Sequence, residues 1–403
     1  MDQFVSFMNY YPKYEYLDNI LSTSGATKVN IFLDLKGNIN SLYMKENIDY
    51  IINQTKGAKY IDNSLFSSVM EFITFHKLYA KKRSVDLNMF FFYDTGMSLY
   101  HTEIFKDYKE GRNRNADVVL PNGMVLQQNG IIRKARSYLE TIPPKDSELF
   151  RHTLNQNYEM INNIGNKIPN VSIIHLKFLE ADFVPYHVRK YILGPFQPKE
   201  IDVIYSTDKD MLQCLDNPNT YIFYKHYKNH KIIDAKNAYS HFFKKEWTHI
   251  DIGLEWFPLV LSILGDASDE FKGVSWFGIV SIYDNIREII KLTGGSVDEL
   301  YKKVQSQSDI FNKDIGTNTK NITKLFDNQP IISRNLKLSS YKLLSEYINS
   351  GFPFEKTTKF HRHIEQVVNN KEKISNGLVL LSALNKAGLG SNIAESTILN
   401  LFK

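Results

Sequence analysis

The chain has 403 residues, of which 43% are hydrophobic, so it can form one large domain or two ordinary domains with a substantial core. Its 49 lysines and arginines exceed its 44 aspartates and glutamates, and this small excess permits a nucleic-acid partner without requiring one. The single cysteine, Cys214, excludes an internal disulfide framework and a multi-cysteine zinc site.

No segment has the pattern of a signal peptide or a membrane span. The N-terminal residues MDQFVSFMNYYPKYEY lack a basic stretch followed by an apolar one. The longest apolar run, WFPLVLSILG at 256–265, is about half as long as the ~20 residues that a membrane-spanning helix needs. We therefore expect a soluble protein of the cytoplasm, or of the host cytoplasm if a phage encodes it, with no membrane partner.

Four short runs of β-branched and aromatic residues are typical of strands buried on both faces of a parallel sheet. Helical patterns lie between these runs, for example at 64–82 and 181–193. The alternation predicts an α/β fold with a mainly parallel central sheet flanked by helices. The predicted strands are VNIFLD (29–34), MFFFYD (89–94), VSIIHL (171–176) and IDVIYS (201–206).

Strand patterns end near residue 250, after a segment at 225–231 that we expect to be a basic hairpin or surface loop. The polar stretch 306–329 is predicted to be a long loop. We therefore divide the chain into an α/β core over 1–250 and an α-helical region over 251–403. The helical patterns of the second part lie at 256–265, 278–292, 296–305, 339–350 and 377–389.

Acidic residues follow every predicted strand. Ligands of open α/β sheets bind beyond the carboxyl ends of the strands, so these side chains are expected to converge on one cleft. One aspartate at a strand end is more often a turn former or a helix cap, but so many together would repel one another unless cations neutralised them. With two that follow the apolar helix at 256–265, the set is Asp34, Asp94, Glu180, Asp182, Asp208, Asp210, Asp266 and Asp269.

Two interpretations are open for Asp208 and Asp210, which follow the fourth strand. They could cap the next helix, MLQCLD, whose N-terminus favours negative charge, or they could bind a divalent cation. Carboxylates without histidine or cysteine favour Mg²⁺ or Mn²⁺ over zinc, and two such ions about 3.5–4 Å apart serve in-line phosphoryl displacement. The eight positions together favour the metal interpretation.

The motifs FFFYDTG, IFKDYKEGRNR, LEADF, YSTDKDML and LGDASDEFKGV, in this order, resemble the 5′ nuclease (flap endonuclease) family, especially phage members of the T-even-phage ribonuclease H type. The resemblance covers roughly 29–290, and a weaker likeness lies in NKAGLGSNIAES. It implies that the eight carboxylates bind two or more Mg²⁺ ions, for which Mn²⁺ can substitute, some of them through water. It also implies a helical arch over 101–150.

Basic residues follow the second strand, and a solvated helix face would also explain them. The resemblance implies that Tyr108 and Lys109 position the substrate strand and that Arg112 matches an arginine of the arch. Cations beside the carboxylates could stabilise a phosphodiester, and Tyr108 could stack on an unpaired base. The other candidates for DNA binding are Lys106, Arg114, Arg133, Lys134 and Arg136.

The segment DASDEFKGVSWFGIVSIYDNI, within about 264–290, resembles the family's helix–hairpin–helix variant. In the family this element holds duplex phosphates through backbone amides and often a monovalent cation, which would be K⁺. Gly273 and Gly278 flank the turn. Trp276 stands where the hairpin usually carries a further glycine, and a tryptophan adopts positive φ less readily, so Trp276 is equally well explained as a core residue.

The leading hypothesis is a metal-dependent 5′→3′ exonuclease or flap endonuclease in which water attacks the phosphate in line, leaving 5′-phosphate and 3′-hydroxyl ends. Its expected substrates are DNA with a 5′ flap or 5′ end at a duplex junction and, by the resemblance, the RNA of RNA–DNA hybrids. The expected task is primer removal and repair in phage-type replication, as a monomer that works with a single-strand-binding protein or a clamp. Two alternatives stay open: a non-catalytic DNA-binding replication factor, and a ribonuclease of the PIN-domain kind.

Overall fold

The computed structural model describes most of the chain in segments separated by gaps. No helix in these segments is long and apolar enough to cross a lipid bilayer. The described residues are 15–36, 45–56, 63–96, 98–106, 108, 118–119, 124–126, 132–134, 141–226, 229–243, 252–266, 269, 271–312, 320–350, 358–370, 373–374, 376–386 and 399.

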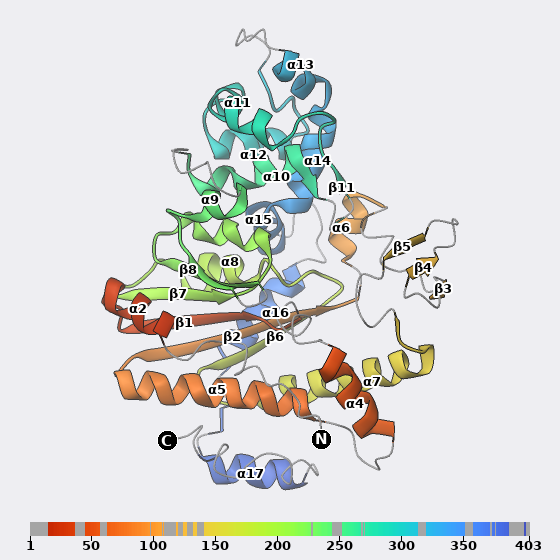
Figure 1. Cartoon of the computed structure of the whole chain (residues 1–403). Helices are drawn as coiled ribbons and strands as arrows, with labels where there is room; N and C mark the ends of the chain where they lie inside the picture. The colour runs from red at the N-terminus through yellow and green to blue at the C-terminus, as the bar shows by residue number, and fades with distance from the viewer. Residues whose placement is uncertain are drawn as a thin grey trace.

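A six-stranded sheet lies at the centre of the α/β core, with strand order β6-β2-β1-β7-β8-β9 (Figure 1). Neighbouring strands from β6 to β8 are parallel, and β9 pairs with β8 in an antiparallel hairpin. The four predicted strands, the mainly parallel sheet and the hairpin at 225–231 are therefore confirmed. The strands are β1 (Lys28–Asp34), β2 (Asp86–Thr95), β6 (Val171–Lys177), β7 (Glu200–Tyr205), β8 (Thr220–His226) and β9 (Asn229–Ile233).

One face of the sheet packs on the long helix α5 (Ser64–Arg83), which lies below the sheet in Figure 1. Because successive side chains of a strand point to opposite faces, Ile31 and Leu33 of β1 belong to this core together with Phe72 of α5. The other helices on this side are α2 (Glu15–Ser24), α7 (Pro144–Gly165), α4 (Lys45–Lys56), which packs on α7, and α17 (Gly377–Lys386).

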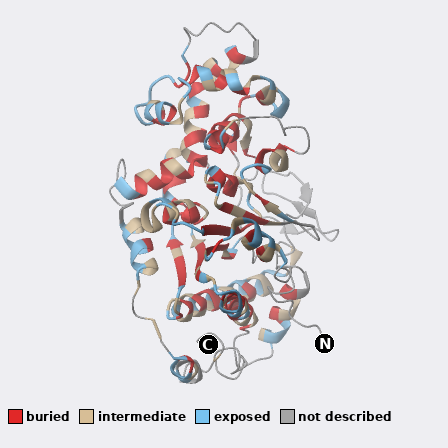
Figure 2. Cartoon of the chain, turned by 90° about the vertical axis from the view of Figure 1, so that its left-hand side faces the viewer, coloured by how far each residue is buried: buried red, intermediate tan, exposed pale blue. Residues whose placement is uncertain are grey.

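The opposite face of the sheet shares one core with the helical region. Phe32 of β1 and Ile289 of α11 (Ile279–Leu292) belong to the same buried cluster, and buried residues in Figure 2 occur on both faces of the sheet and among the helices above it. The division of the chain at residue 250 stays a prediction. The elements here are α8 (Val184–Val188), the π-helical η3 (Arg189–Leu193), the 3₁₀ helices η4 (Lys209–Asp216) and η5 (Leu254–Trp256), α9 (Ala238–Phe243), α10 (Phe257–Leu264), α12 (Val297–Gln305), α14 (Gln329–Ser339), α15 (Tyr341–Ser350) and α16 (Thr358–Val368).

Two features of the helical region differ from the sequence-based expectation. The predicted loop at 306–329 contains a helix, α13 (Lys320–Asp327), because Ile322 and Leu325 are spaced to share one face and are fully buried. A short antiparallel hairpin of β10 (Gly265–Asp266) and β11 (Phe271–Lys272) follows α10. These paired segments are too short to produce a strand pattern in the sequence.

The arch segment at 101–150 is only partly helical. It begins in α6 (Leu99–Ile104) and ends inside α7, which starts before residue 150. Between these helices, residues 118–119, 124–126 and 132–134 form a three-stranded antiparallel sheet, so the prediction of helix is wrong for them. Valines on either side of the turn signal PNG favour a hairpin at this point. The strands are β3 (Val118–Val119), β4 (Met124–Leu126) and β5 (Ile132–Lys134).

Candidate metal centre

The sheet topology brings the strand-end acids to one edge. β1 lies between β2 and β7 and is parallel to both, so Asp34 and Asp94 leave neighbouring strands at the same end of the sheet. The loop after β6 folds across this edge, because the amide of Ala181 donates to Asp94 Oδ2 at 3.3 Å. Ser206, just after β7, donates to Asp34 Oδ2 at 3.5 Å. The predicted convergence of these segments is therefore present in the fold.

Asp208 and Asp210 have different surroundings, although only Lys209 lies between them in the sequence. Asp208 is the N-cap of η4, and its Oδ1 accepts a hydrogen bond from the amide of Asp210 at 2.9 Å. The capping interpretation is therefore confirmed for Asp208. Because the cap hydrogen bond uses Oδ1, Asp208 could bind a metal ion through its other carboxylate oxygen. Asp210 lies inside the fold with 8% of its surface exposed.

Asp210 forms a cluster with two acids from the β10–β11 hairpin. One carboxylate oxygen each of Asp210, Asp266 and Asp269 lies within 4.8 Å of the other two. Burial, followed by the charges of Asp208 and Asp269, raises the pKa of Asp210 well above its usual value. Among the described residues, no donor reaches its buried Oδ1. Three hard oxygen ligands and one unsatisfied buried oxygen fit a divalent cation such as Mg²⁺.

Tyr108 links the two sides of this centre. Its hydroxyl lies 3.1 Å from Glu180 Oε2 and 3.1 Å from Asp269 Oδ2, so it can donate to either carboxylate. The ring stacks on His101 with centroids 4.6 Å apart, and 2% of the residue is exposed. Burial and the charges of Glu180 and Asp269 raise the pKa of Tyr108 well above its usual value, which keeps the hydroxyl protonated. In this conformation its ring is covered, so a contact with an unpaired base would require Tyr108 to move.

Two lysines that the sequence analysis did not identify contact the acids. Lys36 Nζ lies 2.5 Å from Asp94 Oδ1, and Lys209 Nζ lies 2.6 Å from Asp266 Oδ2. Burial alone would lower the pKa of Lys209, but its hydrogen bond to Asp266 and the neighbouring carboxylates raise it above the usual value. The only sequence signal was their position beside predicted ligands, in the motifs DLK and DKD.

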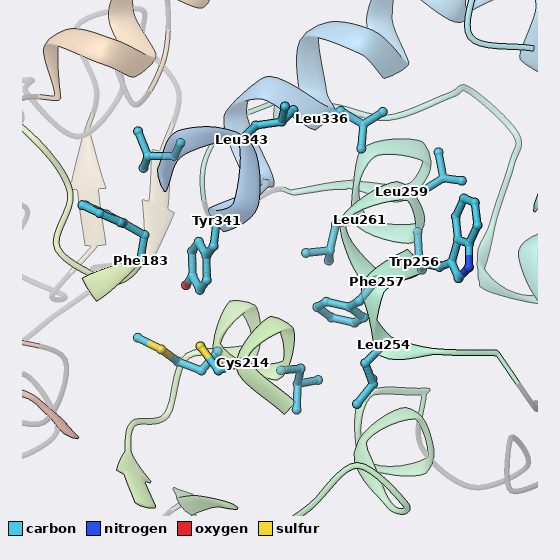
Figure 3. Close-up of a cluster of buried hydrophobic side chains, with 14 of the residues drawn as sticks. Phe183, Cys214, Leu254, Trp256, Phe257, Leu259, Leu261, Leu336, Tyr341 and Leu343 are labelled. Atoms are coloured by element: carbon cyan, nitrogen blue, oxygen red, sulfur yellow. The ribbon is translucent and has the colours of Figure 1, made fainter. Parts of the chain in front are cut away.

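The C-terminal helices supply a third residue that the sequence analysis did not identify. Tyr341, the first residue of α15, lies beside Phe183 and η4 in Figure 3, and its amide donates to Gln213 Oε1 at 3.0 Å. Burial, then the charges of Asp182, Asp208 and Asp210, raises the pKa of Tyr341 well above its usual value. Its buried hydroxyl has no hydrogen-bond partner within the described part of the chain.

Most of the predicted basic residues have side chains outside the part of the chain that the structure describes. Lys106 is exposed just after α6, close in sequence to Tyr108. Arg133 and Lys134 belong to β5, of which only the backbone is described. Their roles stay predictions, as do those of Lys109, Arg112, Arg114 and Arg136, which lie outside the described residues.

The hairpin glycines have different structural roles. A Cβ on Gly273 would lie 2.2 Å from the carbonyl carbon of Leu264, so glycine lets β11 pass close to the end of α10. Gly278 is the exposed residue before α11, and no described atom lies within 4 Å of a Cβ built there. DNA binding by either glycine stays a prediction.

Trp276 is not a core residue. It adopts a left-handed backbone conformation with φ of 65°, and 89% of its surface is exposed. Its neighbours Val274 and Phe277 are buried in its place. The sequence-based alternative that Trp276 packs in the core is therefore wrong, and the turn takes the positive φ that a glycine would supply.

The fold is similar to that of solved 5′-exonuclease structures from bacteriophage T5. The T5 D15 protein crystallised with metal ions matches with a TM-score of 0.53 at 18% identity, over 85% of this chain and 100% of the T5 chain. The D15 flap endonuclease variant in a pseudo-enzyme–product complex with DNA and metal ions matches at 17% identity and a TM-score of 0.53, with the same coverage. The T5 5′-exonuclease with bound zinc matches at 17% identity with a TM-score of 0.52, again over 85% of this chain and 100% of the T5 chain.

No protein-family model and no curated protein sequence matches the chain. The three T5 structures each match over 85% of this chain. The resemblance to phage 5′ nucleases is therefore confirmed at the level of the fold.

Proposed function

We propose that the protein is a divalent-metal-dependent 5′ nuclease that hydrolyses phosphodiester bonds in DNA. The fold that it shares with the phage T5 nucleases supports a nuclease. The observation that carries the proposal is the cluster of Asp210, Asp266 and Asp269, with ligand oxygens within 4.8 Å of one another. A buried carboxylate with an unsatisfied oxygen is costly unless it is neutralised, so this cluster favours a cation as part of the working protein.

The candidate ligands are the eight carboxylates around this edge of the sheet. Asp210, Asp266 and Asp269 would bind one cation. The acids at the ends of β1 and β2 and after β6 would hold a second cation or bind through water. When bound, two divalent cations would neutralise the carboxylates and stabilise the negative charge that develops on the phosphate. The oxygen-only ligand set favours Mg²⁺, with Mn²⁺ as a substitute.

The chain's own residues would orient the site and the substrate. The Tyr108 hydroxyl can fix the carboxylates of Glu180 and Asp269 in their orientations. Lys209 and Lys36 have side chains that are 37% and 49% exposed, so either ammonium group could turn from its carboxylate towards a phosphate. Lys109 and Arg112 are proposed to contact the substrate strand from the arch.

The proposed substrates are DNA ends and branched DNA. One T5 structure is a complex with DNA and metal ions, and it has the same fold as this chain. We infer 5′→3′ exonuclease or flap endonuclease activity at a 5′ end or 5′ flap, and also cleavage of the RNA strand of RNA–DNA hybrids. The task would be primer removal and repair in phage-type replication, carried out by a monomer with a single-strand-binding protein or clamp as partner.

Cleavage of a labelled 5′-flap duplex tests this function. We expect cutting near the flap junction in Mg²⁺, no cutting in EDTA, and no cutting by the double variant Asp208→Asn/Asp210→Asn, which should still bind the DNA. Retained cleavage in the double variant would place the metal site elsewhere. Binding without cutting in both Mg²⁺ and Mn²⁺ would instead support a non-catalytic DNA-binding factor, and preference for single-stranded RNA would support a PIN-type ribonuclease.

A further inference from the structure

We propose that Phe178 is a base-stacking residue at the mouth of the metal centre, which contacts the nucleobase beside the scissile phosphodiester while Lys177 contacts an adjacent phosphate. This inference rests on the proposed nuclease function. It assigns a substrate contact to the loop between β6 and the acids Glu180 and Asp182.

The position of Phe178 relative to the candidate ligands is fixed by backbone hydrogen bonds. Its amide donates to the carbonyl of Thr95 at 2.8 Å, one residue after Asp94, and its carbonyl accepts from the amide of Leu99 at 2.9 Å. Glu180 follows two residues later in the chain. The side chain therefore lies at the edge of the sheet where the carboxylates gather.

The backbone of Phe178 is in a conformation that phenylalanine rarely adopts. Its φ is 65°, in the left-handed region that favours glycine or asparagine. Both backbone polar groups are paired, so the neighbouring elements hold this conformation in place. Strain of this kind persists where the surrounding structure over-determines it, and it is often found at functional sites.

Burial of the ring does not account for a phenylalanine here. The residue is 41% exposed, and the adjacent Leu99 is 58% exposed, so both leave apolar surface in solvent. The ring also leaves no room for a side chain at position 96, because a Cβ on Gly96, whose φ is +83°, would lie 2.7 Å from the ring. A glycine or asparagine at position 178 would make the same turn with less strain. The exposed ring therefore points to a ligand.

The chemistry around the ring suits a nucleotide. Lys177 Nζ lies 5.2 Å from the ring centroid, which places one cation beside one aromatic surface. Proteins that bind single-stranded nucleic acid combine these two groups: bases stack on aromatic rings and cations contact the backbone phosphates. An unpaired or frayed nucleotide that reaches the carboxylates would meet both groups at this edge.

The contact is tested with two flap substrates, each with one 2-aminopurine base, placed on one side or the other of the scissile phosphate. Stacking on an aromatic ring quenches the fluorescence of 2-aminopurine. Binding is measured in Ca²⁺ by fluorescence anisotropy, cleavage in Mg²⁺, and stability by thermal unfolding. We expect Phe178→Gly to abolish the quenching at one position, to weaken binding about 5- to 100-fold, and to unfold at an equal or higher temperature because glycine relieves the strain. Phe178→Leu, which keeps an apolar side chain, should also lose the quenching, and Phe178→Trp should retain it.

Two control variants separate stacking from general effects. Lys199 has a φ of 61° and is exposed. It directly precedes β7, at the end of this strand that is opposite to the carboxylates, so Lys199→Gly should relieve similar strain without changing binding. Leu378→Ala removes an exposed apolar side chain of α17 and should also leave binding unchanged. Unchanged quenching and affinity in Phe178→Gly, with wild-type cleavage intact, would overturn this inference alone. If the wild-type chain neither bound nor cut the flap substrate, the proposed function would fail instead.

Discussion

Asp208 and Asp210 show how two acids that are adjacent in a motif acquire different tasks. The carboxylate of Asp208 accepts from the amide of Asp210, the second residue of η4, which is the ordinary role of an aspartate before a helix. Asp210 points into the cluster with Asp266 and Asp269, and one of its oxygens is buried without a donor from the described residues. The metal-free fold therefore carries an electrostatic cost that is concentrated on Asp210.

Replacing Asp210 by asparagine should have opposite effects with and without metal. The fold raises the pKa of Asp210, so at neutral pH it holds this carboxylate in an environment that disfavours the charged form. In EDTA, Asp210→Asn should raise the free energy of unfolding by roughly 1 kcal/mol or more, because it removes that charge. The increase in unfolding temperature that Mg²⁺ gives the wild-type protein should be lost.

Thermal unfolding in EDTA and across a Mg²⁺ titration measures both effects. The control is Asp234→Asn, which removes a carboxylate from a loop after β9, outside the cluster. An Asp210→Asn protein that is still stabilised by Mg²⁺ as strongly as the wild type would rule out Asp210 as a metal ligand.

Tyr108→Phe isolates the hydroxyl that lies between Glu180 and Asp269. The ring can still stack on His101, so the fold should be retained, while both carboxylates lose a donor that orients them. Loss of a group that orients metal ligands typically costs about 10- to 100-fold in metal affinity or activity. We expect a shift of this size in the Mg²⁺ concentration required for flap cleavage.

Tyr100→Phe is the matched control. Tyr100, in α6, is a buried tyrosine like Tyr108, but its hydroxyl donates to the backbone carbonyl of Lys337 at 2.9 Å. Removal of this hydroxyl should affect stability but not the Mg²⁺ requirement. If Tyr108→Phe needed no more Mg²⁺ than the wild-type protein, the hydroxyl would be a structural contact only.

At the scale of elements, η4 is held in place by the C-terminal helices. Gln213 Nε2 donates to the carbonyl of Ser339 at 2.8 Å, and Gln213 Oε1 accepts from the amide of Tyr341 at 3.0 Å. A single buried side chain thus satisfies two backbone groups at the junction of α14 and α15. Since Asp210 lies on the same 3₁₀ helix, this junction also helps to hold Asp210 in position.

Gln213→Ala should therefore weaken both folding and metal binding. It leaves two buried backbone groups unsatisfied, at about 1–3 kcal/mol each, so we expect a loss of about 2–6 kcal/mol in the free energy of unfolding. Urea unfolding measures this loss, and a Mg²⁺ titration of thermal stability measures the metal affinity. Gln305→Ala, which removes an exposed hydrogen bond to Glu346, should cost less than about 0.5 kcal/mol. Equal losses in the two variants would contradict the role of this junction.

The sequence predicts the strands of this site better than it predicts the contacts between them. β1, β2, β6 and β7 are continuous apolar runs, and acids at their ends could be assigned to one edge because parallel strands share a direction. The bond between Gln213 and the amide of Tyr341 joins residues 128 positions apart, and Lys209 meets Asp266 only because the β10–β11 hairpin folds over η4. No local pattern encodes such distances. β3 to β5 were missed because each strand is too short to establish a period.

At the scale of the whole molecule, two buried histidines couple folding to pH on opposite faces of the sheet. His76 of α5 contacts the carbonyl of Phe72 at 2.9 Å and the hydroxyl of Tyr205 at 3.2 Å. His187 of α8 contacts His361 of α16 at 3.0 Å. Burial lowers the pKa of His76 to about 4, and burial together with His361 lowers that of His187 to about 3.

These pKa values lie below the unfolded value of about 6.5, so at a pH between the folded and the unfolded value the unfolded chain binds more protons than the folded chain. Stability must therefore fall as the pH drops below about 6.5. Each histidine should contribute about 2 kcal/mol to the loss between about pH 7 and about pH 5. Carboxylates with raised pKa values, such as Asp216 at about 6, oppose this trend, so the effect is isolated by comparing variants.

His76→Gln and His187→Gln should each reduce the difference in free energy of unfolding between these two pH values, whatever their effect at neutral pH, because glutamine does not titrate. Urea unfolding at the two pH values measures the difference, and His152→Gln, at an exposed position of α7, is the control that should leave it unchanged. A wild-type pH dependence in both variants would show that neither buried histidine becomes protonated on unfolding in this range. A reduced dependence in His187→Gln alone would assign the acid sensitivity to the packing of α8 against α16, on the face of the sheet that shares its core with the helical region.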